Sequence, residues 1–226
     1  MNMEQRIKNL YDRIKKACDK AERDISEIQV VAVTKTVSTD RIEEAYKWGF
    51  RNFGENRVQE AREKIPNLSH LKDAKWHLIG HLQKNKVKYA VRMFDMIQSV
   101  DSEQLAYEIS KRAKDNIDVL VEVNTSMEPQ KHGVRPDEVF DLVEYVLSLE
   151  HLNLLGFMTV GPYPVSEKGS KRAFSLLREI RDKAEVKFDR RFPILSMGMT
   201  EDFEYAILEG STMLRIGRGI FGERTY

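Results

Sequence analysis

Short apolar runs alternate with amphipathic stretches along the whole chain. The runs are rich in β-branched residues and carry few charges, as expected for strands that are buried on both faces of a parallel sheet. The stretches between them repeat apolar residues every three or four positions, which predicts helices with one buried face. Strands are predicted at residues 30–35, 52–54, 76–79, 96–100, 119–123, 152–158, 193–196 and 212–216.

Each predicted strand except the last is followed by a predicted helix. An additional helix is expected before the first strand, at residues 3–23, with a buried face formed by Ile7, Leu10, Tyr11, Ile14, Ala17 and Cys18. The other helices are predicted at about 38–49, 58–65, 82–93, 102–113, 136–149, 170–185 and 200–209. Pro66 is expected to stop the helix at 58–65, because proline lacks the N–H that a helix interior needs.

This alternation predicts a parallel sheet with helical crossovers. Eight strand–helix units within 226 residues favour a (β/α)8 TIM barrel over a doubly wound open sheet. No linker or low-complexity stretch interrupts the repeat, so we expect one domain over residues 1–226, with the helix at 3–23 as an extra N-terminal element. In such a barrel, functional residues lie at the carboxyl ends of the strands.

Composition and charge exclude several classes of protein. The chain is 41% hydrophobic and 32% charged, which is ordinary for a soluble domain. Its 37 basic and 36 acidic residues give a net charge of +1, so no overall field attracts nucleic acid or a membrane. Cys18 is the only cysteine, which rules out an internal disulfide and fits a reducing compartment. With no apolar signal segment at its start and no span-length run, the chain is expected to be cytoplasmic.

Lys35 ends the first predicted strand, where packing gives no reason for a lysine. An amine at the rim of an apolar barrel is poorly solvated, which favours its neutral, nucleophilic form. This is the chemistry of a lysine that forms a Schiff base with a carbonyl compound. The alternative is a lysine that ends the strand and extends into solvent.

A second informative region follows the seventh and eighth predicted strands. Ser196 and Thr200 supply hydroxyl groups, while Gly198 and Gly217 allow the backbone to approach an anion closely. The loops after these two strands form the recurrent phosphate site of (β/α)8 barrels. Turn formation and helix capping would use the same residue types, but their placement on both loops favours phosphate binding.

Other motifs carry less weight. Residues 217–222 match the G-x-G-x-x-G fingerprint, yet too little chain follows for a dinucleotide-binding unit. His77 and His81 have helical metal-ligand spacing but straddle a strand end and Gly80, so no metal site is expected. The chain has no G-x-S-x-G elbow of a serine hydrolase. A basic stretch at residues 84–92 has only Tyr89 as an aromatic residue between its charges and is interpreted as a solvated helix face.

A lysine together with a phosphate site indicates a phosphorylated carbonyl compound. Pyridoxal phosphate (PLP) and the sugar-phosphate substrate of a lysine aldolase both satisfy this description. Arg215, on the last strand and two residues before Gly217, could face the pyridine nitrogen of PLP, which favours the cofactor. An aldolase more usually carries its lysine on a late strand.

The chain resembles the pyridoxal phosphate homeostasis protein family, the single-domain relatives of the alanine racemase N-terminal barrel. Matching segments are residues 32–36, 53–56 with 59–60, 76–80 with 82–83 and 85–86, 131–133, 195–200 and 215–222. The resemblance implies that Lys35 forms the imine and Asn56 lines the cofactor pocket. It also implies that Ser196, Thr200 and Gly217 contact the phosphate and that Arg215 lies at the pyridine nitrogen. Thr200 stands where serine is frequent, and residues 158–161 are less typical of the family.

The expected function is to hold PLP rather than to react it. A cationic Arg215 disfavours protonation of the pyridine nitrogen, which makes the ring a weak electron sink. Racemisation needs a second base, which alanine racemases take from a C-terminal β domain that this chain lacks. We therefore expect a monomeric PLP homeostasis protein, with no catalytic residues, that supplies PLP to apo forms of PLP-dependent enzymes. The alternatives are a low-activity amino-acid racemase and, third, an aldolase.

Overall fold

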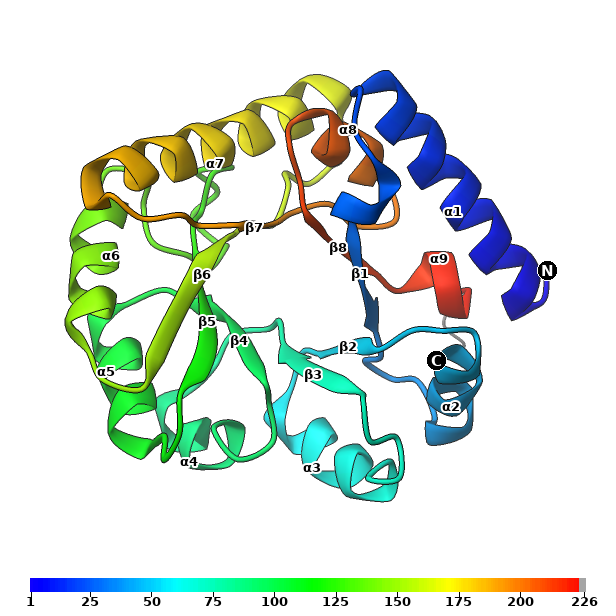
Figure 1. Ribbon diagram of the computed structural model, residues 1–226, viewed down its shortest axis with the longest axis horizontal. Coiled ribbons are helices and arrows are strands. Elements are labelled where there is room, and N and C mark those ends of the chain that lie inside the picture. The colour runs from blue at the N-terminus through cyan, green and yellow to red at the C-terminus, as the bar shows by residue number, and fades with distance from the viewer. Residues whose placement is uncertain (224–226) are drawn as a thin grey trace.

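Eight parallel strands close into a barrel in the order in which they occur along the chain (Figure 1). The structure is a computed structural model in which residues 1–223 are described. The strands are β1 (Gln29–Val33), β2 (Asn52–Glu55), β3 (Lys75–Leu78), β4 (Met96–Val100), β5 (Ile117–Glu122), β6 (Leu152–Met158), β7 (Ile194–Ser196) and β8 (Met213–Ile216). The predicted (β/α)8 barrel is confirmed.

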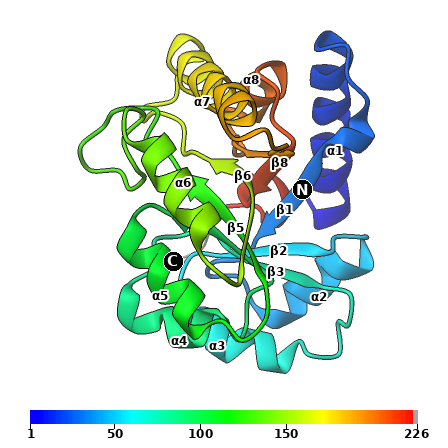
Figure 2. The same cartoon turned by 60° about the vertical axis from the view of Figure 1, so that its left-hand side comes forward.

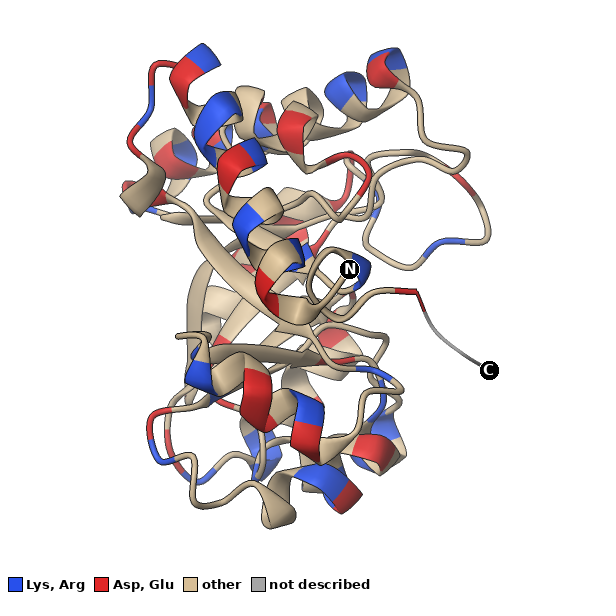
Figure 3. Ribbon diagram, turned by 90° about the vertical axis from the view of Figure 1, so that its right-hand side faces the viewer, with Lys and Arg blue, Asp and Glu red and all other residues tan. Residues whose placement is uncertain are grey.

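Helices surround the strands on the outside of the barrel, as Figures 1 and 2 show. They are α1 (Met3–Lys20), α2 (Thr39–Lys47), α3 (Val58–Asn67), α4 (Val87–Ala90), α5 (Glu103–Arg112), α6 (Val139–Ser148), α7 (Glu167–Phe188), α8 (Phe203–Leu208) and α9 (Arg218–Phe221). Lys and Arg are interspersed with Asp and Glu along the helices in Figure 3. No helix within residues 1–223 is both long and apolar enough to cross a membrane.

The extra N-terminal helix α1 packs against α8 and α9, so it covers the outside of the barrel near the point of closure. Asn2 caps it by accepting a hydrogen bond from the N–H of Gln5 at 2.9 Å. Its buried face matches the prediction except at Tyr11, which is 41% exposed. Tyr11 lies at the edge of the apolar stripe, where its ring is tilted against Phe50.

Three predictions about helices differ from the structure. The predicted helix at 82–93 is a 3-10 turn at Lys84–Lys86 followed by the four-residue α4, which still buries Val87 and Ala90. Pro66 does not stop α3, which ends one residue later, because the last turn closes through the N–H of Leu68 on the Ile65 carbonyl at 3.0 Å. The last strand is also followed by a helix, the short α9.

The strand register sets the relation between the two ends of the chain. β1 pairs with β2 on one side and with β8 on the other, and the second pairing places Val31 beside Arg215. Loops that leave β1 and β8 therefore meet at one edge of the barrel, although they are far apart in sequence. This closure brings together the two regions that the sequence singled out.

A chain of polar side chains crosses the otherwise apolar interior of the barrel. Arg215 Nη1 donates to Ser196 Oγ (2.7 Å), and Ser196 Oγ donates to Gln98 Oε1 (2.6 Å). The Gln98 amide nitrogen then lies 3.0 Å from His77 Nδ1, and His77 Nε2 lies 3.0 Å from Asn52 Oδ1. Because the oxygen of Gln98 is used as an acceptor, its nitrogen donates, which assigns the proton of the neutral His77 ring to Nε2.

Burial lowers the pKa of His77 to about 4, so the ring is neutral at pH 7 and can accept the hydrogen bond from Gln98. The unfolded chain binds this proton more tightly than the folded chain, since an ordinary histidine has a pKa of about 6.5. The stabilisation is therefore complete above about pH 6.5 and is lost as the pH falls toward 4.

We expect acidification from pH 7 to pH 5 to lower the free energy of unfolding by about 2 kcal/mol through His77 alone. The measurement is urea denaturation at the two pH values for the wild type and for His77→Gln, which has no ionisable ring. The difference between the two proteins isolates this contribution from other titrating groups. Equal pH slopes for the two proteins would contradict the interpretation.

Candidate functional site

A cavity of about 590 Å³ lies at the carboxyl ends of the strands. It is lined by five of the six residues predicted from the sequence, namely Lys35, Asn56, Thr200, Arg215 and Gly217. A larger cavity of about 760 Å³ opens at the amino ends of the strands and is lined by residues that include Asn52 and His77. Because (β/α)8 barrels carry their sites at the carboxyl ends, the first cavity is the candidate functional site.

The sequence predicted that Lys35 ends the first strand. In the structure β1 ends at Val33, and Lys35 lies in the turn that follows it. Helix α3 holds this turn from both sides: Lys64 Nζ donates to the Thr34 carbonyl at 2.7 Å, and the Thr36 N–H donates to the Glu60 carboxylate. Thr36 has a φ of +62°, a left-handed conformation that costs about 1 kcal/mol or more for a β-branched residue. The backbone of Lys35 is therefore fixed by its neighbours, and its side chain lines the cavity.

The buried carboxylate of Glu55 contacts the first residue of this turn, Thr34. Glu55, at the end of β2, is fully buried and accepts hydrogen bonds from Thr34 Oγ1 at 2.7 Å and from Lys64 Nζ at 3.1 Å. Burial raises the pKa of Glu55, while the bond from Thr34 and the charge of Lys64 oppose that shift. Sequence reasoning did not identify this network, although the segment 53–56 with 59–60 was among the matching motifs.

Asn56 places a polar acceptor at the cavity. Its Oδ1 is buried and has no hydrogen-bond partner within residues 1–223. A buried polar group without a partner costs about 1–3 kcal/mol, so the site is suited to a ligand that donates to this atom. Gly80 packs directly on the Asn56 backbone, since a Cβ at Gly80 would lie 2.3 Å from the Asn56 carbonyl oxygen.

Arg215 presents a buried guanidinium group to the cavity. It is 4% exposed, and in addition to Ser196 Oγ it donates to the carbonyl oxygens of Ser196 and Thr159, each at 2.7 Å. Burial lowers its pKa to about 10, and the charges of Asp202 and Glu122 oppose this shift. The group therefore stays cationic at pH 7, and the interior polar chain fixes its orientation.

Two carboxyl groups balance the charge of Arg215. Burial, followed by the nearby charge of Asp101, raises the pKa of Glu122 to about 7, against the opposing effect of Arg215. Burial also raises the pKa of Asp202, whose Oδ1 accepts from the N–H of Met199 at 2.7 Å. Its Oδ2 is buried without a partner within the described chain.

Thr200 and Gly217 lie where the loops after β7 and β8 meet. The two loops are joined by the N–H of Gly219, which donates to Thr200 Oγ1 at 3.3 Å. Ser196 lies deeper, at the end of β7, where it is fully buried and does not line the cavity. Its hydroxyl is bonded to Gln98 and Arg215, so its direct contact with a phosphate stays a prediction, and the observed contacts make it a support for Arg215.

The arrangement suits a ligand with an aldehyde or ketone, an anionic group and an aromatic acceptor. Lys35 offers an amine to the carbonyl group. Thr200 offers a hydroxyl group and Gly217 a loop backbone to the anion. Arg215 offers a guanidinium N–H, whose direction is fixed, to the aromatic acceptor. A group with this chemistry fits the residues present if it also carries a hydroxyl donor, because Asn56, which lines the cavity, has a buried acceptor without a partner in the described chain.

Comparisons with known proteins agree with this geometry. Residues 6–225 match the family model for the alanine racemase N-terminal domain. The pyridoxal phosphate homeostasis protein of Aquifex aeolicus is 44% identical, with full coverage of both chains. The human protein of the same name is 39% identical, over 97% of this chain and 86% of its own length.

Solved structures give the same result. PipY of Synechococcus elongatus, determined with PLP bound, superposes with a TM-score of 0.87 at 31% identity and covers 98% of this chain. Alanine racemase of Clostridium difficile has a TM-score of 0.72 at 16% identity; the match spans 95% of this chain and 58% of the racemase, and it shows the shared barrel fold. With full-length relatives well above 30% identity, the chain belongs to the pyridoxal phosphate homeostasis protein family.

Proposed function

We propose that this protein binds PLP as a Schiff base on Lys35 and serves PLP homeostasis by holding the cofactor and supplying it to other proteins. The observation that carries the proposal is that Lys35, Asn56 and Arg215 line one cavity. Thr200 and Gly217, from the loops after β7 and β8, line the same cavity. The names of the relatives and the PLP bound to PipY support the choice of ligand.

Lys35 forms the covalent link. In its uncharged form, Nζ would condense with the aldehyde carbon of PLP, and both hydrogens of the amine would leave with the aldehyde oxygen as water. The clamped turn between Thr34 and Thr36 limits where the amine can reach, which reduces the entropy lost on binding. Thr200 and Gly217 hold the phosphate, and Asn56 accepts a hydrogen bond from the ring substituents.

Arg215 determines how the bound cofactor behaves. PLP supplies an electron sink when its pyridine nitrogen is protonated. A cationic guanidinium beside that nitrogen disfavours the added proton, and the pKa of Arg215, at about 10, keeps the guanidinium cationic. The residues around the ring thus favour retention of PLP over carbanion chemistry, and we assign no catalytic residue.

The cavity rim has a bearing on the racemase alternative. Tyr163 lines the cavity and is 82% exposed. Its phenol group is of the residue type that racemisation requires as a second base. Lys131 also lines it, but its Nζ is bonded to Glu128 and to the Gly161 carbonyl. Cys18 is buried in α1 and cannot serve. A weak racemase acting through Tyr163 is therefore the second candidate function.

The remaining parts of the proposal concern the location of the protein, its oligomeric state and its partners. We infer a cytoplasmic protein, because a single buried cysteine suits a reducing compartment. We propose that the protein is a monomer. The recipients of PLP are inferred to be apo forms of PLP-dependent enzymes.

Replacement of Lys35 tests the covalent link. We expect the wild type to show the absorbance band of a PLP imine and Lys35→Ala to lose it, since no amine remains at that point of the cavity. Lys131→Ala is the matched control, because it removes the other lysine of the cavity and should keep the band. Borohydride reduction and peptide mapping should place the label on Lys35; a label on Lys131, or a band in Lys35→Ala, would contradict the assignment.

Transfer is tested with an apo-enzyme. We expect an apo form of a PLP-dependent enzyme to regain activity when mixed with the PLP-loaded protein, because the Schiff base is reversible and the cavity opens to solvent. Gel-filtered Lys35→Ala, treated with PLP in the same way, should restore little activity. If free PLP reactivates the enzyme while the loaded wild type does not, the supply function is wrong.

Racemisation is tested by optical rotation. We expect a constant rotation when the PLP-loaded protein is incubated separately with single enantiomers of alanine, serine and other amino acids. A decaying rotation that is abolished in Tyr163→Phe would establish the racemase instead.

A further inference from the structure

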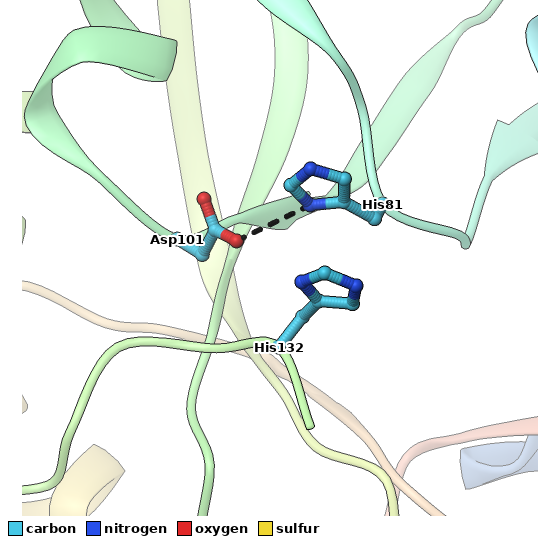
Figure 4. A group of neighbouring side chains, drawn as sticks. All are labelled: His81, Asp101 and His132. Atoms are coloured by element: carbon cyan, nitrogen blue, oxygen red, sulfur yellow. Dashed lines mark ion pairs between the residues drawn. The ribbon is translucent and has the colours of Figure 1, made fainter. Parts of the chain in front are cut away.

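Three potential metal ligands converge beside the cofactor cavity, from three loops at the carboxyl end of the barrel (Figure 4). His81 follows β3, Asp101 directly follows β4, and His132 lies between β5 and α6. One ligand atom from each, two imidazole nitrogens and a carboxylate oxygen, lies within 4.8 Å of the others. His81 and His132 are exposed and Asp101 is half-buried, so an ion can reach them from solvent.

The spacing of the donor atoms suits a small cation. His81 Nδ1 lies 3.5 Å from Asp101 Oδ2. Two ligand atoms bound at about 2.1 Å to a tetrahedral ion are about 3.4 Å apart, so this pair needs almost no movement. The His132 ring stacks on His81 with its centroid 4.0 Å away and an interplanar angle of 10°. His132 is exposed, and binding of one ion by both histidines requires its side chain to rotate out of this stack.

The backbone holds His81 in place. Gly80 packs so closely on Asn56 that no side chain fits there, and Ser99 Oγ donates to the Gly80 carbonyl at 2.8 Å. The residue after Gly80 therefore starts from a fixed position. A ligand that is already placed loses less entropy when the ion binds.

Asp101 and His132 are supported in a similar way. Ser102 Oγ donates to Asp101 Oδ1 at 3.3 Å, which leaves Oδ2 directed at His81. Such a contact orients a carboxylate ligand. Beyond His132, Gly133 packs against the Asn124 N–H, and the Val134 N–H donates to the Glu122 carbonyl at 2.8 Å, which ties this loop to the end of β5.

We infer that His81, Asp101 and His132 bind one divalent transition-metal ion of the Zn²⁺ class, with a coordination position left for water. Two nitrogen donors and one carboxylate are typical of zinc, copper, nickel or iron(II), whereas Mg²⁺ and Ca²⁺ prefer oxygen ligands alone. The sequence directed attention to His77 and His81, but the structure separates them, since His77 lies inside the barrel. The inference does not depend on whether PLP is bound.

Isothermal titration of the tag-free full chain, dialysed against a chelator, with ZnCl₂ tests the site. We expect one ion per chain in the wild type, and affinity at least about tenfold lower in His81→Ala and in His132→Ala. Mg²⁺ in excess should not compete. Addition of Co²⁺ in place of Zn²⁺ should give visible absorption bands from nitrogen and oxygen ligation, and these should weaken in both variants.

His70→Ala is the matched control. His70 is an exposed histidine that faces a carboxylate, Glu43, at 3.1 Å, without a second histidine. This variant should bind Zn²⁺ like the wild type. The inference is overturned if the wild type binds no stoichiometric Zn²⁺, if His81→Ala and His132→Ala bind as tightly as the wild type, or if His70→Ala loses binding equally. Circular dichroism without metal should confirm that all variants fold.

Discussion

The burial of the Arg215 guanidinium is the constraint on which much of this barrel depends. A charge removed from water is costly unless every donor finds an acceptor. Here the carbonyls of Ser196 and Thr159 and the hydroxyl of Ser196 accept its hydrogen bonds, and Glu122 and Asp202 supply opposing charge. These partners come from β5, β7 and the segments that follow β6 and β7, so the Arg215 side chain of β8 is held by three neighbouring parts of the barrel.

The sequence predicts the architecture well because strand burial is a local signal. The predicted strands at 96–100 and 152–158 match β4 and β6 to the residue, since each apolar run is bounded by polar or turn residues. Errors fall where tertiary contacts decide the boundary. Lys35 was assigned to a strand, yet contacts from α3 turn the chain at Thr34. Pro66 was expected to stop a helix, yet α3 ends at Asn67, one residue after it.

The site is predictable only where a residue type reveals its role without its partners. Lys35 has such a signal, because packing does not explain a lysine at the end of a buried strand. Thr200 and Gly217 also have one, because a hydroxyl group and a glycine follow the last two strands. Gln98 and Glu55 have none, since their roles arise from contacts across the barrel. Ser196 combines both cases. Its residue type predicts a phosphate contact, which stays a prediction, while its hydrogen bonds to Gln98 and Arg215 depend on contacts across the barrel that the sequence does not reveal.

The direction of the interior hydrogen bonds supports the proposal that this cavity holds PLP rather than reacts it. Arg215 donates to Ser196, Ser196 to Gln98, Gln98 to His77 and His77 to Asn52, so every member has a fixed role as donor or acceptor. A proton cannot move along the chain without reversing all of these bonds, and the buried His77 resists protonation. Glu122, whose pKa is raised to about 7 by burial, does not line the cavity, so it is not placed to exchange a proton with a ligand there. The polar chain instead fixes Arg215 as a permanent cation, so the same interactions that stabilise the barrel restrict the chemistry at its upper end.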